Sequence, residues 1–274
     1  MKESSPIGVF DSGYGGLTIL SEIRKKLPEY DFLYLGDNAR APYGNRSFDI
    51  VYEYTLEAVK LLFSRGCHLV ILACNTASAK ALRTIQQQDL PFLDSNKRVL
   101  GVIRPSTEEI GLLTKTKHVG VLATEGTVQS QSYILELQKF APEIVVNQHA
   151  CPLWVPLIEN NKHFSEAGKN ILSEDVSSLL AKDPKIDAII LGCTHYPLVQ
   201  EYLESIVSKE IKIVSQGEIV AKKLEQYLLN HPEIAVTCSK NSIVQYLTTE
   251  DSKVFDENAA RFLRVDIHSE TIHF

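Results

Sequence analysis

Short apolar runs alternate along this chain with amphipathic segments long enough to form helices, and no other feature constrains the fold as strongly. Short buried strands separated by helices are typical of parallel sheets that helices cover on both faces. The sequence therefore predicts an α/β fold. The expected strands are the apolar runs Ile7–Phe10, Phe32–Leu35, His68–Ala73, Val99–Ile103, His118–Ala123, Ile144–Val146, Ala188–Leu191 and Lys212–Val214.

Several helix positions can be predicted from local signals. Ser47 can cap a helix that runs to Phe63, because the apolar residues after it share one face. Ser106 and Glu109 have the spacing of a capping box, which predicts a helix start there. From about residue 210 onward we expect one strand, a long helix over 217–229 and an irregular tail.

The chain also matches itself in two places. The segment Ile7–Gly15 aligns with Val119–Thr127, and Leu69–Asn75 aligns with Ala188–Thr194, at offsets of 112 and 119 residues. Two matches in the same order at similar offsets predict two related α/β lobes. The polar stretch 94–98 indicates a boundary, so we expect a first lobe of 1–98 plus 210–274 and a second lobe of 99–209.

Charge and hydropathy exclude several classes of protein. The 34 acidic and 28 basic residues give a net charge of -6, and no Lys/Arg cluster exceeds residues 24–26, so nucleic acid is not an expected partner. No apolar run approaches the ~18 residues of a membrane span. The first six residues lack the basic start and apolar stretch of a secretory signal. We therefore expect a cytoplasmic protein that does not enter a membrane.

The cysteines are odd in number and form no C-x-x-C pair, which argues against a disulfide framework or a zinc finger. Free cysteines are most often buried core residues, and a few are reagents. Only position in the chain can separate the two cases for Cys67, Cys74, Cys151, Cys193 and Cys238.

Polar and reactive side chains gather where four of the expected strands end. Ligands of open α/β sheets bind outside the carboxyl ends of strands, where helix N-termini also bind anions and stabilise thiolates. Caps, tight turns and ordinary buried histidines can explain these residues one at a time. Their joint placement at matched strand ends favours an active site that includes Asp11, Ser12 and Gly13, then Cys74, Asn75 and Thr76, then Thr124 and Thr127, and finally Cys193, Thr194 and His195.

Two cysteines at equivalent strand ends leave several chemistries open: a redox pair, metal ligands, one nucleophile with a bystander, or two bases. Redox pairs are usually close in sequence, and zinc needs further ligands that the strand ends do not supply. Two opposed thiols suit inversion at a carbon, because a thiolate can remove a proton from one face while a thiol returns one to the other. Asp11 and His195 are the candidates for assisting these thiols, and no arginine is needed.

Six segments resemble the signature segments of bacterial glutamate racemases. They follow the order found in that family, span most of the chain and include both cysteine motifs. They are Phe10–Thr18, Gly36–Gly44, Ala73–Ser78, Leu122–Thr127, Cys151–Glu159 and Leu191–Leu198.

The resemblance implies two pseudosymmetric α/β lobes with the active site between them. It implies interconversion of L- and D-glutamate without a cofactor or metal, supplying D-glutamate for peptidoglycan, in a homodimer. Cys74 carries over as the base for D-glutamate, assisted by Asp11, and Cys193 as the base for L-glutamate, assisted by His195, which Glu159 orients. The residues that match substrate contacts are Asp11, Ser12, Tyr43, Gly44, Asn75, Thr76, Thr124, Thr194 and His195.

The chain departs from the family pattern in two loops. Pro105-Ser106 replaces a common Pro-Gly, and Ser215-Gln216-Gly217 replaces a usual Asp-Ser-Gly. Cys67, Cys151 and Cys238 are interpreted as structural, and Cys151 is the one that we place near the site, because it begins a family-like segment. Two other functions stay open: a racemase for aspartate or another acidic amino acid, and a two-lobed amino-acid-binding protein, although binding a carboxylate needs no thiol.

Overall fold

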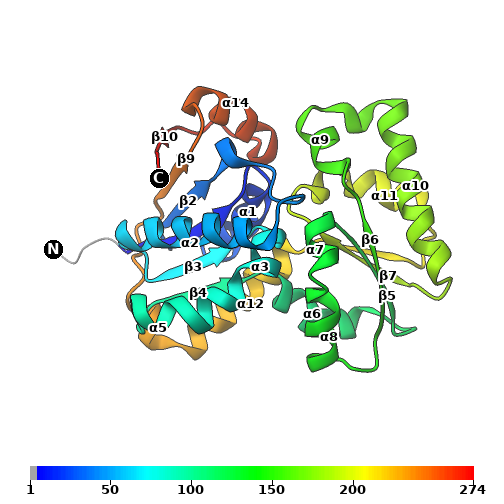
Figure 1. The fold of residues 1–274 in the computed structure, drawn as a ribbon, viewed down its shortest axis with the longest axis horizontal. Helices are drawn as coiled ribbons and strands as arrows, with labels where there is room; N and C mark the ends of the chain where they lie inside the picture. Colours follow the sequence, from blue (N-terminus) through cyan, green and yellow to red (C-terminus); the bar gives the residue numbers. More distant parts are fainter. Residues whose placement is uncertain (1–4) are drawn as a thin grey trace.

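The computed structural model describes residues 5–274 and contains two separate parallel sheets flanked by helices (Figure 1). One sheet has six strands: β1 (Ile7–Asp11), β2 (Phe32–Gly36), β3 (Leu69–Leu72), β4 (Arg98–Gly101), β9 (Val244–Thr248) and β10 (Ser269–Thr271). The other has four: β5 (His118–Ala123), β6 (Val145–Ala150), β7 (Ala188–Gly192) and β8 (Lys212–Val214). This arrangement confirms the predicted α/β fold class.

The strand order of the four-stranded sheet repeats part of the larger one. The six-stranded sheet has the order β10-β9-β2-β1-β3-β4, and the four-stranded sheet has the order β6-β5-β7-β8. β1 pairs with β3 through Gly8 and Val70, and β5 pairs with β7 through Val119 and Ala188. The segments that match in the sequence therefore form equivalent central strands of the two sheets.

Two strands lie in a different sheet from the one expected. β4 was expected to begin the second lobe, but it pairs with β3 in the six-stranded sheet. β8 was expected in the returning part of the first lobe, but it pairs with β7 in the four-stranded sheet. The chain thus passes to the four-stranded sheet after β4 and returns after β8, so the polar stretch 94–98 precedes an edge strand rather than the crossing.

The last part of the chain, expected to be an irregular tail, is ordered structure. β9 pairs with β2 through Tyr246 and Tyr34, and β10 pairs with β9. Between them lies helix α14 (Ser252–Leu263), which buries Phe255 and Ala259. β9 escapes sequence analysis because Gln245 interrupts its short apolar pattern.

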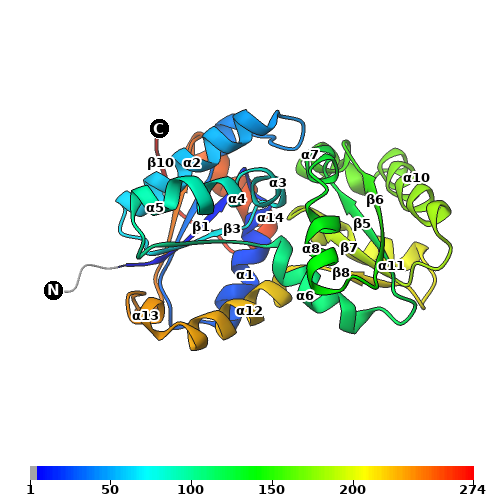
Figure 2. The same cartoon turned by 60° about the horizontal axis from the view of Figure 1, so that its bottom comes forward.

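Helices cover both faces of the six-stranded sheet (Figure 2). Ile7 and Val9 of β1 join the core under α1, α12 and α14, whereas Phe10 joins the core under α2 and α3, as the alternation of side chains along a strand requires. The helices of this part are α1 (Gly16–Lys26), α2 (Phe48–Ser64), α3 (Asn75–Lys80), α4 (Leu82–Thr84), α5 (Leu90–Leu93), α12 (Gly217–Asn230) and α13 (Pro232–Ala235), with the short helices η1 (Asn38–Arg40) and η2 (Ile85–Asp89).

The four-stranded sheet is also buried on both faces. Val119 and Val121 of β5 pack in the core that includes α6 and α8, and Leu122 packs in the core that includes α9, α10 and α11. The helices here are α6 (Ile103–Leu113), α7 (Glu125–Gln129), α8 (Ser132–Phe140), α9 (Trp154–Glu159), α10 (Glu166–Lys182) and α11 (Gln200–Ile206), with η3 (Lys162–Phe164) and η4 (Tyr196–Val199).

One predicted cap is confirmed and the other is wrong. The Ser47 hydroxyl accepts a hydrogen bond from the Ile50 N–H at 3.3 Å, and α2 follows it. Ser106, however, lies inside α6, which begins at Ile103, and its hydroxyl donates to the Val102 carbonyl at 3.1 Å. Pro105 does not mark the boundary because the first turn of a helix tolerates a missing N–H.

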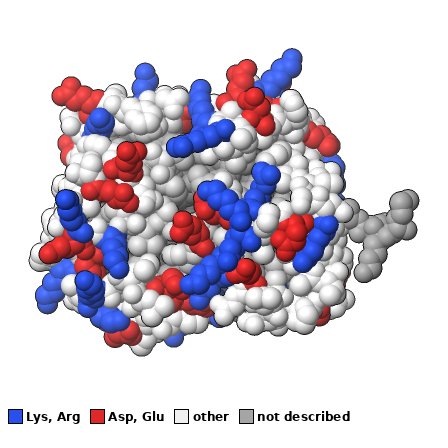
Figure 3. Space-filling model, turned by 180° about the vertical axis from the view of Figure 1, so that it is seen from behind, with Lys and Arg blue, Asp and Glu red and all other residues white. Residues whose placement is uncertain are grey.

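One face of the molecule shows no evident division by charge. Acidic and basic side chains are interspersed over the face opposite to that of Figure 1 (Figure 3). Within residues 5–274, no helix combines the length and the apolar character needed to cross a membrane.

Candidate active site

A cavity of about 240 Å³ lies at the carboxyl ends of β3, β5 and β7, between the two sheets. That volume suits a small molecule. Its wall includes every site residue expected from the sequence except Asp11 and Thr127. Those lining residues are Ser12, Gly13, Tyr43, Gly44, Cys74, Asn75, Thr76, Thr124, Glu159, Cys193, Thr194 and His195.

Cys74 is the N-cap of α3, two residues beyond the end of β3, and it is 5% exposed. Its Sγ accepts a hydrogen bond from the Ala77 N–H at 3.5 Å and lies 3.5 Å from the Ser12 hydroxyl. Burial is the larger cause and the nearby Asp11 carboxylate the next, and they raise the pKa of Cys74 to about 12. The site therefore holds Cys74 as a thiol at neutral pH.

Cys193 follows β7 directly and has a different companion. Its Sγ lies 3.9 Å from Nδ1 of His195, whose Nε2 lies 2.9 Å from a carboxylate oxygen of Glu159. Burial alone would lower the pKa of His195, but the hydrogen bonds to Cys193 and Glu159 outweigh it and raise the pKa to about 10. The imidazole is therefore charged at neutral pH and stands between a sulfur and a carboxylate.

Asp11 lies beneath the cavity and is fully buried. One carboxylate oxygen accepts the Gly13 N–H at 2.9 Å, and the other accepts the Thr194 hydroxyl at 3.2 Å. Burial raises the pKa of Asp11, although the charge of His195 opposes the shift. Asp11 thus joins the turn after β1 to the turn after β7, across the two sheets.

The turn after β1 also packs closely on His195. A Cβ built on Gly15 would come within 2.5 Å of Nδ1 of His195 and closer still to the Thr194 hydroxyl. Only a glycine leaves room for this approach.

Hydroxyl groups from both sheets meet on the opposite wall. The Thr124 hydroxyl lies 2.9 Å from the Thr76 hydroxyl and 3.0 Å from the Thr127 hydroxyl. Beside them the Gly126 N–H donates to the Gly44 carbonyl at 2.7 Å, which attaches the loop after η1 to the start of α7. Tyr43 of the same loop donates its hydroxyl to Asp37 and is 1% exposed.

Asn75 reaches the cavity wall, but both ends of its side-chain amide are already bonded. Its Nδ2 donates to Oε1 of Gln216 at 2.6 Å, and its Oδ1 accepts the Tyr133 hydroxyl at 2.8 Å. Gln216 was noticed in the sequence only as a departure in a loop. Nothing in a local pattern indicates that it meets a residue 141 positions away.

Several lining residues were not expected. Cys151 was interpreted as structural and near the site but not as a site residue; it lines the cavity, and burial raises its pKa well above the ordinary thiol value. It follows β6, so the strand-end argument that singled out Cys74 and Cys193 could have included it. The other unexpected residues are Ala41, Pro42, Asn45, Glu125, Pro152, Val155 and Pro156.

The donors around the cavity are neutral apart from His195. No lysine or arginine in residues 5–274 lines it, so a bound anion would meet hydroxyls, amides and backbone N–H groups. Over the same residues, no three side chains among histidine, cysteine, aspartate and glutamate converge as metal ligands would.

Comparison with known proteins gives the family. The sequence pattern of the Asp/Glu/Hydantoin racemase family matches residues 18–224. A glutamate racemase of Ruegeria sp. (strain TM1040) is 40% identical over 271 residues, which cover 95% of this chain and 97% of that one.

Solved structures agree. The glutamate racemase isoform RacE1 from Bacillus anthracis aligns with a TM-score of 0.89 at 34% identity, covering 99% of this chain and 98% of that one. The glutamate racemase from Francisella tularensis, solved in complex with D-glutamate, aligns with a TM-score of 0.85 at 30% identity and the same coverage. On these matches, which extend over nearly its whole length, the chain belongs to the glutamate racemase family, within the Asp/Glu/Hydantoin racemases.

Proposed function

We propose that this protein interconverts L- and D-glutamate without a cofactor, by proton transfer at Cα between the substrate and two cysteines. The observation that carries the proposal is the placement of Cys74 and Cys193 after equivalent strands of two related sheets, both lining one small cavity. Membership of the glutamate racemase family supports glutamate as the substrate. We place one lobe around each sheet. These lobes differ from the expected limits of 1–98 plus 210–274 and 99–209, because β4 belongs to the first lobe and β8 to the second.

In the L to D direction, the Cys193 thiolate removes the α proton, so that the Cα–H bond breaks and an S–H bond forms. The electron pair left on Cα delocalises into the neighbouring carboxylate. The Cys74 thiol then gives its proton to the opposite face, which forms the new Cα–H bond and leaves Cys74 as a thiolate. Proton exchange with solvent restores the starting state, and the D to L direction runs through the same steps in reverse.

The surroundings of the two thiols support this assignment. The charged His195 imidazole lies 3.9 Å from the Cys193 sulfur, and Glu159 holds the imidazole in place. The Asp11 carboxylate favours the protonated form of Cys74, which must be a proton donor when L-glutamate is the substrate. The resting site thus suits L-glutamate, and Asp11 assists Cys74 through charge.

Substrate carboxylates would be held by the neutral donors of the wall. The candidates are the hydroxyls of Ser12, Thr76 and Thr124, the backbone N–H groups at the starts of α3 and α7, and the backbone N–H of Thr194, whose hydroxyl is donated to Asp11. Asn75 would contribute through its backbone N–H and through the second N–H of its side-chain amide, since only one of the two is donated to Gln216. Tyr43 and Gly44, which also match substrate contacts of the family, line the same cavity.

The proposed role is to supply D-glutamate for peptidoglycan in the cytoplasm, as a homodimer, on the basis of the family resemblance. The decisive test is incubation of the purified protein with L-glutamate in D2O, with optical rotation and the Cα proton signal followed together. Loss of rotation together with deuterium at Cα is expected, and it should persist after treatment with a chelator and without pyridoxal phosphate. If neither signal changes for the folded protein, the glutamate assignment is wrong, and L-aspartate in the same assay tests the main alternative.

A further inference from the structure

A fully buried hydrogen-bond network lies directly behind Cys74, and its centre is Gln216, which is 2% exposed. Oε1 of Gln216 accepts Nδ2 of Asn75 at 2.6 Å. Its Nε2 faces three acceptors: the Tyr133 hydroxyl at 2.9 Å, the Ser106 hydroxyl at 2.9 Å and the Val102 carbonyl at 3.1 Å. Because the Tyr133 hydroxyl donates in turn to Oδ1 of Asn75 at 2.8 Å, the three side-chain groups form a closed ring.

The members of this network come from every part of the chain that joins the two sheets. Val102 and Ser106 lie where the chain leaves the six-stranded sheet after β4, and Gln216 lies where it returns after β8. Asn75 belongs to α3 beside the six-stranded sheet, whereas Tyr133 belongs to α8 on the four-stranded sheet. The side-chain amide of Gln216 therefore links the two segments that join the sheets to each other and to Asn75, the residue after Cys74.

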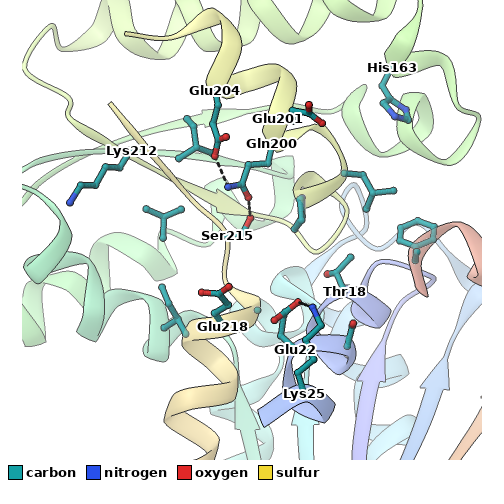
Figure 4. A pocket seen from close by; sticks show the side chains of 18 of the residues that line it. Thr18, Glu22, Lys25, His163, Gln200, Glu201, Glu204, Lys212, Ser215 and Glu218 are labelled. Atoms are coloured by element: carbon teal, nitrogen blue, oxygen red, sulfur yellow. Dashed lines mark hydrogen bonds and ion pairs between the residues drawn. The ribbon is translucent and has the colours of Figure 1, made fainter. Parts of the chain in front are cut away.

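Ser215, the neighbour of Gln216 in the segment between β8 and α12, faces away from this network. The Ser215 hydroxyl donates to Gln200, whose Nε2 donates to Glu204 at 2.7 Å (Figure 4). These side chains line a separate outer groove between α11 and α12, where Glu218 is also found. Gln200 thus bonds to the crossing without belonging to the buried network.

We infer that Gln216 is a positioning residue for racemisation: through its bond to Asn75, it keeps the Cys74 thiol aligned with the Cys193 thiol. The inference rests on the proposed function. Asn75 is the first residue of α3 and Cys74 is its N-cap, so a shift of the Asn75 amide moves the thiol with it. Proton transfer requires close alignment, and a misplacement of about 1 Å can lower a rate by about 100-fold.

The test uses Gln216→Met, which keeps an unbranched side chain of similar size and removes all four contacts, and Tyr133→Phe, which removes one hydroxyl from the ring. Gln200→Ala is the matched control, because it removes a hydrogen bond to the same crossing outside the network. For both network variants we expect kcat to fall by about 10- to 100-fold, while KM changes by less than about threefold because the lining donors remain.

A second readout separates misalignment from loss of folded protein. Each variant is given L-glutamate in D2O, and initial rates of deuterium uptake into recovered L-glutamate and of D-glutamate formation are compared. When Cys74 is out of register, it protonates the carbanion less often. The Cys193 thiol, after exchanging its proton for deuterium from solvent, then returns a deuteron more often to the face from which the proton was removed. The ratio of labelled L-glutamate to D-glutamate formed should therefore rise severalfold in Gln216→Met and Tyr133→Phe and stay at the wild-type value in Gln200→Ala.

Different outcomes separate this inference from the proposed function. If the wild type does not racemise glutamate, the proposed function fails. If the wild type is active and the ratio in Tyr133→Phe equals that of the wild type, Gln216 has no positioning role, whether or not Gln216→Met folds. A rise of the same size in Gln200→Ala would also overturn the inference, because the effect would then belong to the crossing as a whole.

Discussion

Replacement of Gly15 by alanine tests how closely the turn after β1 must approach His195. A Cβ at this position would lie 2.5 Å from Nδ1 of His195, whereas non-bonded atoms prefer separations of about 3.5 Å. Either the turn or the imidazole must therefore move by about 1 Å, a displacement that can lower kcat/KM by about 100-fold. Overpacking of this kind should also lower the free energy of unfolding by about 1–3 kcal/mol.

The assay is the rate of racemisation of L-glutamate, with urea unfolding measured on the same preparations. Gly111→Ala is the control, because its new Cβ would meet nothing closer than 3.8 Å and it lies within α6. That variant should keep the wild-type rate and gain about 0.5–1 kcal/mol of stability. A Gly15→Ala protein with wild-type kcat/KM would show that the contact between the turn and His195 is unimportant for the reaction.

Two further predictions concern the groups that carry the chemistry. Cys74→Ser and Cys193→Ser should each abolish most racemisation while glutamate still binds, as measured by calorimetry; normal turnover in either variant would exclude the two-thiol mechanism. His195 has a pKa of about 10 when folded, against about 6.5 in the unfolded chain, so its stabilising contribution is complete below pH 6.5 and is lost as the pH rises through 10. Between pH 8.5 and 10 the free energy of unfolding of the wild type should therefore fall more steeply than that of His195→Asn, by up to about 1.4 kcal/mol per pH unit. Equal slopes for the two proteins would mean that His195 is not charged in the fold.

The parts of the fold and site that follow local rules could be predicted from the sequence. Cys74 and Cys193 follow apolar runs that also match each other, so their strand-end positions could be read directly. Strand β9 could not be predicted. Its own mixed pattern does not indicate a strand, and it forms one because it pairs with β2. Ser106 has a cap-like spacing but lies inside α6, where the Val102 carbonyl takes its hydroxyl.

The contacts between distant segments were beyond sequence reasoning. Asn75 was expected to contact the substrate, but its bonds to Gln216 and Tyr133, which lie 141 and 58 positions away in the chain, could not be predicted. The residues alone predicted the two thiols only as a pair. Their separate roles and the role of Glu159, which is 36 residues from His195, came from the family resemblance. Such features arise only when the two sheets are assembled.

The shared strand order of the two sheets has a consequence for how such a site could arise. A carbanion at Cα is planar, and a single protein surface reaches only one of its faces. One β2-β1-β3-β4 unit offers one thiol at the end of its third strand, and a second unit of the same order offers another from across the cavity. Duplication of one ancestral half would thus supply the second reagent in a single step, after which different neighbours, Asp11 for one thiol and His195 for the other, could adapt each copy to one enantiomer.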